Sequence, residues 1–177
     1  MEIAFLMDKL ESIDPENETT SYLMYECNQR GHTVYSLEPH DVYIRGNEIV
    51  ARMRNITVAP ALSMRKYWRS LINCMKHDEL IFETVTDLDA IFLRKNPPLN
   101  YQVMEFLAPV SDKVFMINST AGQILGNSKL YILYWTDIIP GTHVSRDPAR
   151  LKKIIDDFGG DMVIKPLQRY GGQGVIK

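Results

Sequence analysis

The chain has 177 residues, of which 45% are hydrophobic and 24% charged, and its formal net charge at pH 7 is −2. This composition is typical of a folded globular protein and excludes disorder, collagen and coiled coil for the chain as a whole. The near balance of charge gives no electrostatic reason to expect a nucleic acid or an anionic membrane as a partner.

The amino terminus predicts a buried strand. Residues 3–7 are apolar, no basic residue precedes them, and Asp8 follows at once, so the run does not resemble a signal peptide. No stretch of the sequence approaches the roughly 18 apolar residues that would span a membrane. Cys27 and Cys74 form no CxxC pair, which favours a reducing cytoplasm.

The first two thirds of the chain predict an α/β fold with an open, mostly parallel sheet flanked by helices. Apolar runs of strand length alternate with segments of helical periodicity, which is typical of βαβ units. Gly46 separates two β-rich segments and predicts an inserted β-hairpin. We expect strands at 3–7, 33–37, 88–93 and 114–117, a hairpin of 41–44 with 48–56, a helix capped by Thr19, Thr20 or Ser21 and ending near residue 30, a helix at 100–108, and core residues Tyr67, Trp68, Leu71, Ile72 and Met75 at helical spacing.

The sequence changes character near residue 121. Asn127-Ser128 predicts the start of a helix through Trp135, and Asp147-Pro148 the start of one that ends before Gly159. Strands are expected at 142–145 and at 161–167, the second carrying Lys165, with a return strand from residue 175. Because the chain stops three residues into that strand, we expect the amino-terminal part of a longer protein; the alternative is a short product with a frayed last hairpin.

Several common sequence motifs are absent. The first strand is not followed by GxGxxG, and neither GxxxxGK[ST] nor GxSxG occurs. These absences argue against a dinucleotide-binding fingerprint, a P-loop and the commonest serine-hydrolase pattern. The four histidines lack metal-binding spacing, so no metal site is predicted from them.

The positive signal is a lysine before a glycine-rich loop. Lys165 precedes Gly171, Gly172 and Gly174, and such glycines let backbone N–H groups turn toward one phosphate beside a mobile ammonium. The alternative is a hairpin turn that needs positive φ angles, with an exposed lysine. Lys129 taken by itself reads as a solvated surface residue.

Several segments together resemble the prokaryotic glutathione synthetase family of ATP-grasp ligases over nearly the whole chain. The most specific are Arg94-Lys95-Asn96-Pro97-Pro98 and the stretch from Lys165 to Gly174. The family usually has Asp where Asn96 stands, which puts the contacts of that loop in doubt. Weaker segments are Phe5-Leu6-Met7-Asp8, Gln29-Arg30-Gly31, Asp41-Val42-Tyr43, Ile117-Asn118 and Asn127-Ser128-Lys129-Leu130.

The resemblance implies a Rossmann-like pre-ATP-grasp domain over 1–122 and the beginning of an ATP-grasp domain over 123–177. It also implies ligation of γ-glutamylcysteine to glycine, with ATP and Mg²⁺, through an acyl phosphate. Lys129 and Lys165 match the family's nucleotide-contacting lysines, and Gly171, Gly172 and Gly174 match its phosphate-covering loop. The family's magnesium ligands lie beyond Lys177, so we expect this chain alone to be inactive.

Asp8, Ser21 and Arg94 are candidates for substrate binding, because ligands of open α/β sheets bind at the carboxyl ends of strands. Arg94 could pair with a substrate carboxylate or form an interdomain salt bridge. Asp8 could instead accept hydrogen bonds from a neighbouring helix.

Two other functions stay open. One is an ATP-grasp ligase with another amine acceptor, and the other is a non-catalytic module or split subunit completed by a second chain. For the whole protein we expect a cytoplasmic homo-oligomer that acts on small molecules and binds neither nucleic acid nor membrane.

Overall fold

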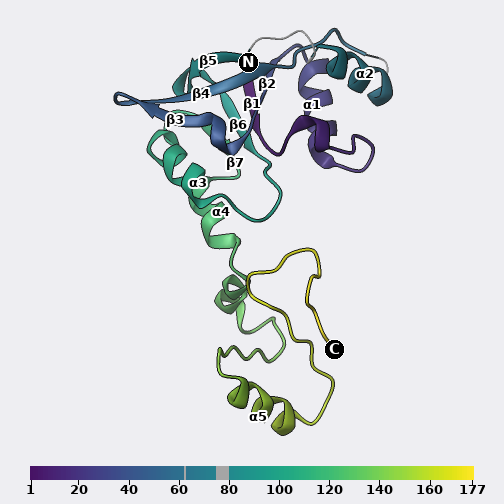
Figure 1. Ribbon diagram of the computed structural model, residues 1–177, viewed down its shortest axis with the longest axis vertical. Helices are drawn as coiled ribbons and strands as arrows, with labels where there is room; N and C mark the ends of the chain where they lie inside the picture. The colour runs from purple at the N-terminus through teal and green to yellow at the C-terminus, as the bar shows by residue number, and fades with distance from the viewer. Residues whose placement is uncertain (62, 75–79) are drawn as a thin grey trace. The chain divides into compact units, whose positions relative to one another are not determined.

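The apolar run at the amino terminus forms β1 (Glu2–Leu6), an inner strand of a seven-stranded sheet (Figure 1). β1 pairs in parallel with β2 (Thr33–Leu37) on one side and with β6 (Ala90–Leu93) on the other. The strand order is β3-β4-β2-β1-β6-β7, and β5 pairs with β4. The remaining strands are β3 (Val42–Arg45), β4 (Glu48–Asn55), β5 (Leu80–Thr84) and β7 (Phe115–Ile117).

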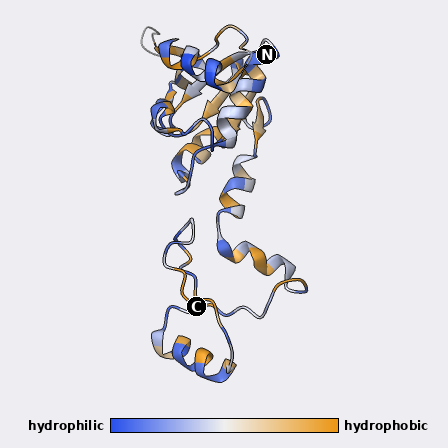
Figure 2. Cartoon of the chain, turned by 90° about the vertical axis from the view of Figure 1, so that its right-hand side faces the viewer, coloured by the Kyte–Doolittle hydropathy of each residue, from blue (hydrophilic) through white to orange (hydrophobic). Residues whose placement is uncertain are grey.

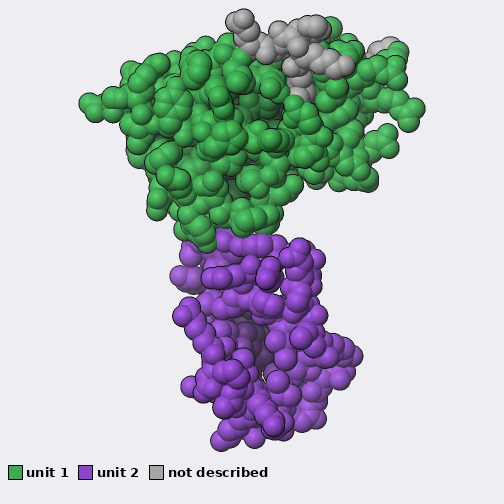
Figure 3. All heavy atoms as spheres, viewed as in Figure 1, with its two compact units in different colours: residues 1–124 green, residues 125–177 purple. Residues whose placement is uncertain are grey.

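The computed structural model describes residues 1–61, 63–74 and 80–177, so Met75 lies outside the described residues. The chain forms two compact units, Met1–Ile124 and Leu125–Lys177, which Figure 3 colours separately. No helix in the described ranges is long and apolar enough to cross a membrane. The helices are α1 (Thr19–Gln29), α2 (Met64–Cys74), α3 (Tyr101–Leu107), α4 (Thr120–Gly126), the 3-10 helix η5 (Lys129–Trp135) and α5 (Pro148–Phe158).

The predicted α/β fold with its inserted hairpin is confirmed. β1, β2, β6 and β7 are parallel, and the hairpin of β3 and β4 joins β2 through antiparallel pairing. Gly46 has a φ of 63° in the hairpin turn, a conformation that glycine adopts without steric cost. β5 was not predicted, and it extends the antiparallel part along β4.

Both faces of the sheet are covered, which explains why β1 is apolar from Ile3 to Leu6. Ile3 and Phe5 point into one core cluster with Met24 of α1 and Tyr67 of α2. Ala4 and Leu6 alternate with them and join the second cluster, where α3 packs. Figure 2 shows this apolar character on the strands of the sheet.

The start of α1 differs from the sequence-based prediction. The residue that caps this helix is Glu18, whose side chain makes no capping hydrogen bond. Ser21 instead donates its hydroxyl to the backbone carbonyls of Pro15 and Glu18, at 2.7 and 2.6 Å. Asp14, four residues before Glu18, orders the turn that leads into α1. Its carboxylate accepts hydrogen bonds from Asn17 Nδ2 and Glu16 N, which lower its pKa.

Unit 2 is less regular than its sequence predicted. α5 forms as expected, with Asp147 accepting a hydrogen bond from Ala149 N and with Gly159 ending the helix in the left-handed region. The strand predicted at 142–145 is wrong, because none of the residues that the structure describes pairs with them. The strand predicted at 161–167 is also wrong, since only one antiparallel bridge joins Ile164 to Ile176. The predicted helix to Trp135 is the 3-10 helix η5.

Unit 2 also lacks a core of its own. It is described throughout, and none of its 53 residues from Leu125 to Lys177 is buried. Apolar side chains such as Tyr134 and Ile138 are 72% and 76% exposed. Unit 1 holds both core clusters, so the burial that stabilises the fold lies there.

The hydroxyl of Tyr67 gives a prediction about stability. It is buried in unit 1 with no hydrogen-bond partner among the described residues, and an unsatisfied buried hydroxyl costs about 1–3 kcal/mol. Burial also raises the pKa of the Tyr67 hydroxyl above its ordinary value near 10. Above pH 10 the hydroxyl therefore stays protonated in the folded state but loses its proton in the unfolded chain. Unfolding then releases a proton, and a rise in pH past 10 lowers the free energy of unfolding.

We therefore expect Tyr67→Phe to keep or raise the free energy of unfolding at pH 7 by up to about 1 kcal/mol. The variant should lose less stability than the wild type between pH 9 and pH 11, as urea denaturation would measure. Tyr35, whose pKa is raised by burial and by its hydrogen bond to Glu2, still contributes in both proteins. An equal loss of stability in variant and wild type would contradict this account.

Candidate functional site

The topology of unit 1 creates a reversal of the chain's direction across the sheet where β1 and β6 end. The chain passes from β1 to β2 on one side, whereas β6 pairs with β1 on the other side, so connections run in opposite directions from this point. Ligands of open α/β sheets bind at such a reversal, beyond the carboxyl ends of the strands. Asp8 lies two residues after the end of β1, and Arg94 directly follows the end of β6.

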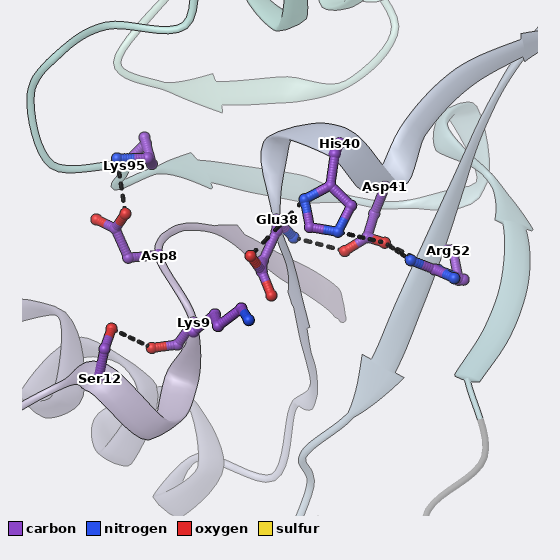
Figure 4. Close-up of polar contacts among 8 residues, drawn as sticks. All are labelled: Asp8, Lys9, Ser12, Glu38, His40, Asp41, Arg52 and Lys95. Carbon is purple, nitrogen blue, oxygen red and sulfur yellow. Dashed lines mark hydrogen bonds and ion pairs between the residues drawn. The ribbon is translucent and has the colours of Figure 1, made fainter.

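Asp8 is held by the segment that follows β6. Its carboxylate receives Lys95 Nζ at 2.6 Å on one oxygen (Figure 4). Its other oxygen accepts the backbone N–H of Asn96 at 3.0 Å. Arg94 N donates to Leu6 O at 2.7 Å, which adds a backbone link between the two strand ends. Asp8 therefore fixes the Arg94–Asn96 segment, and Lys95 is a site residue that sequence reasoning did not select.

The side chain of Arg94 contacts the start of α1, where Ser21 lies. The Arg94 side chain is exposed, and its Nε donates to Thr20 Oγ1 at 3.2 Å. Ser21 is fully buried and gives its hydroxyl to backbone carbonyls, so in this structure it orders the turn before the helix. Asp8, Arg94 and the start of α1 thus meet at one strand edge, and the substrate roles of all three candidates stay predictions.

A second group of charged residues lies beside the ends of β1 and β2, and sequence reasoning did not select it. Asp41 accepts Arg52 Nε and Nη2 on one oxygen, at 2.8 and 2.6 Å, and the N–H of Glu38 on the other. His40 lies 3.7 Å from both neighbouring carboxylates (Figure 4). Arg52 and Arg54 are two residues apart on β4 and therefore lie on the same face of the strand. This spacing could have been recognised in the sequence.

In unit 2 the structure brings Lys129 to the segment that precedes the glycines. Its Nζ donates to the carbonyl oxygens of Pro166 at 2.8 Å, Leu167 at 3.1 Å and Arg169, and it lies 5.5 Å from the centre of the Tyr170 ring. Ser128 caps η5 by accepting Leu130 N, which places Lys129 in the first turn. An ammonium has three N–H donors, so these carbonyls occupy all of them.

The glycine loop itself needs glycine. Gly171, Gly172 and Gly174 have φ angles of 58°, 77° and 71°, which side chains other than glycine rarely adopt. A Cβ on Gly174 would also meet Pro166 Cγ at 3.0 Å. Consecutive residues of this kind leave backbone N–H groups free to converge on an anion.

Lys165 differs from Lys129 in its surroundings. Its side chain is exposed, and no hydrogen bond or ion pair with another described residue holds it. An unengaged ammonium one residue after the Ile164–Ile176 bridge is available for an anionic ligand. Unit 2 therefore carries an unengaged lysine and a loop with positive φ angles in one segment, and the engaged Lys129 of η5 contacts that segment.

Comparison with protein families identifies two adjoining matches. Residues 1–122 match the family described as "Prokaryotic glutathione synthetase, N-terminal domain". Residues 128–177 match the one described as "Prokaryotic glutathione synthetase, ATP-grasp domain". The first match alone spans more than half of the chain.

Curated relatives carry the same name. The chain is 28% identical over 182 residues to "Glutathione synthetase" of Synechocystis sp., covering 99% of this chain and 56% of the relative. It is 29% identical to the proteins of that name from Thermosynechococcus vestitus and Coxiella burnetii, again over 99% of this chain and over 56% and 53% of theirs. The chain spans about half the length of these relatives.

Proposed function

The chain belongs to the prokaryotic glutathione synthetase family, and from this we propose that the full-length protein joins γ-glutamylcysteine to glycine with ATP and Mg²⁺. The family membership makes it an ATP-grasp ligase of the carbon–nitrogen class. The observation that carries the proposal beyond the family match is the contact of Lys129 with the segment leading into the glycine loop. The domain boundaries proposed are 1–122 and 123–177.

Residues of unit 2 fit the phosphates of ATP. The proposed contacts are Lys129, Lys165 and the N–H groups of Gly171, Gly172 and Gly174. The exposed Lys165 ammonium supports them because no other described residue engages it, and the positive φ angles of the glycines support them because such turns can direct backbone N–H groups toward an anion. Lys129 would release at least one carbonyl to reach a phosphate, and this release would free the loop to move.

The proposed chemistry needs cations and an enclosed site. ATP, when bound, supplies the phosphoryl group that activates the dipeptide carboxylate as an acyl phosphate, with ADP as the leaving group. The glycine amine then attacks the acyl carbon, forms the amide bond and displaces inorganic phosphate. Lys129 and Lys165 would offset the repulsion between phosphate and carboxylate. The glycine loop would exclude water, to which an acyl phosphate is labile.

The described residues do not fit a magnesium site. They contain no group of three or more His, Cys, Asp and Glu side chains that could hold a metal ion.

The dipeptide is proposed to bind unit 1 beyond the carboxyl ends of β1 and β6. Arg94 is exposed there and could form a bidentate pair with a carboxylate, while Asp8 and Lys95 hold the segment that carries it. Ser21 would act by ordering the start of α1. We also propose a cytoplasmic homo-oligomer with small-molecule substrates and without nucleic acid or membrane partners.

Ligation by the full-length protein tests this proposal. With γ-glutamylcysteine, glycine and ATP we expect equal amounts of glutathione, ADP and phosphate, whereas residues 1–177 alone should give none. Turnover with amine acceptors other than glycine only would indicate a different ATP-grasp ligase. The absence of ATP turnover with any acceptor would overturn the proposal.

A further inference from the structure

A groove of about 530 Å³ lies on unit 1 between the start of α1 and the first two turns of α2, which lie side by side (Figure 1). Small-molecule sites commonly have volumes of about 300–1,000 Å³. α1 contributes Tyr22 to the lining, and the segment before α1 contributes Glu16. The lining residues of α2 recur at a spacing that places them on one face of the helix: Met64, Arg65, Trp68 and Arg69.

The apolar part of the groove consists of two aromatic rings and a thioether. Trp68 and Met64 are partly buried and pack against the core cluster that contains Tyr67, so the core holds them from behind. Tyr22 is 50% exposed. An aromatic ring of a ligand can stack on Trp and Tyr rings and contact a Met sulfur favourably. The groove therefore favours a planar aromatic group over a polar one.

The charged part of the groove has a cation without a partner. Arg69 is exposed, and no hydrogen bond or ion pair joins its side chain to another residue in the described ranges. Arg65 Nη2 lies 3.9 Å from Glu16 Oε1, which is too long for a hydrogen bond, and both side chains are exposed. Arg69 is therefore the lining group that selects an anion.

The net charge of the lining selects the kind of anion. Two guanidinium groups and one carboxylate leave one positive charge. A carboxylate carries one negative charge and matches it, whereas a phosphate monoester carries nearly two at pH 7. An ammonium on the ligand would find only Glu16, which already lies beside Arg65. The lining thus favours a monoanion without a positive group, which distinguishes this ligand from an amino acid.

We propose that this groove binds a small planar aromatic carboxylate, with the ring against Trp68 and Tyr22 and the carboxylate on Arg69. The guanidinium fork can take both carboxylate oxygens at once. None of the lining residues named is a candidate for binding the nucleotide or the dipeptide, so this inference does not depend on the proposed function.

Titration of the ¹⁵N-labelled chain of residues 1–177 with unlabelled probes tests the proposal. The indole N–H signal of Trp68 reports binding, and Trp135→Phe assigns it because the chain has two tryptophans. Indole-3-acetate should shift this signal with a Kd near about 1 mM. Indole-3-acetamide, which has the ring without the charge, and cyclohexylacetate, which has the charge without the aromatic ring, should each bind at least about tenfold more weakly.

Variants localise the binding to the groove. Arg69→Gln should weaken indole-3-acetate at least about tenfold and leave indole-3-acetamide unchanged, which a general loss of structure would not do. Lys66→Gln is the matched control, because Lys66 is an exposed cation of the same helix outside the lining, and it should change neither affinity. Tyr22→Ser should weaken both indole ligands alike, by about three- to tenfold.

Three results would overturn the proposal. One is the absence of a saturable shift of the Trp68 signal below about 10 mM indole-3-acetate. Another is equal affinity for indole-3-acetate and indole-3-acetamide. The third is a dimer of the free chain in light scattering that Arg69→Glu dissociates, which would assign the groove to a second copy of the chain.

Discussion

The substitution Lys165→Ala will weaken ATP binding by the full-length protein roughly ten- to a hundredfold. A hydrogen bond to a charged group contributes about 1.5–3 kcal/mol, and every 1.4 kcal/mol is about tenfold in affinity. Lys165 is exposed and holds no other described residue, so its removal leaves the fold unchanged. Calorimetric titration with ATP measures the loss.

Lys153→Ala is the matched control for this prediction. Lys153 is an exposed lysine of the same unit, on α5, and it has no proposed contact with the nucleotide. Its ATP affinity should equal that of the wild type. An unchanged affinity in Lys165→Ala would remove Lys165 from the proposed site.

A polypeptide of residues 1–124 will fold cooperatively, whereas residues 125–177 alone will stay unfolded. Both core clusters lie in unit 1, while no residue of unit 2 is buried. Ordering a residue costs about 1–2 kcal/mol of backbone entropy, which exposed apolar side chains cannot offset. We therefore expect the first polypeptide to be folded and the second to be unfolded in the absence of denaturant.

Circular dichroism and urea denaturation of the two polypeptides measure this difference. Residues 1–124 should show one sigmoidal transition, and residues 125–177 a linear change with denaturant. A cooperative transition in residues 125–177 would contradict the account. So would the loss of the transition in residues 1–124.

Much of unit 1 could be predicted because local and tertiary requirements agree there. β1 is apolar from Ile3 to Leu6 since helices cover both sheet faces, and Gly46 marks the hairpin turn by its positive φ angle. In unit 2, α5 was readable from Asp147 at its cap and Gly159 at its end. These signals lie within the segment that they specify.

What could not be predicted depends on partners far along the chain. β5 exists through its pairing with β4, and its own sequence was ambiguous. The Asp41–Arg52 pair arises from the register of the hairpin, and Lys129 meets carbonyls about forty residues later. Ser21 has the chemistry of a helix cap, but Glu18 occupies that position and the serine hydroxyl bonds backward.

The substrate candidates show the same limit. Asp8 could be placed at a strand end from the sequence, but its partners Lys95 and Asn96 follow from the parallel pairing of β1 with β6. The glycine loop was identified by composition, and the contact that ties it to Lys129 required coordinates.

A crystal structure of the full-length protein with a non-hydrolysable ATP analogue tests the central claim most directly. We predict that Lys129 Nζ and Lys165 Nζ both lie within about 3 Å of phosphate oxygens, with the glycine-loop N–H groups directed at the same phosphates. Lys129 will then have released at least one of its carbonyl partners. An analogue bound elsewhere, with Lys129 still on all three carbonyls, would contradict the account.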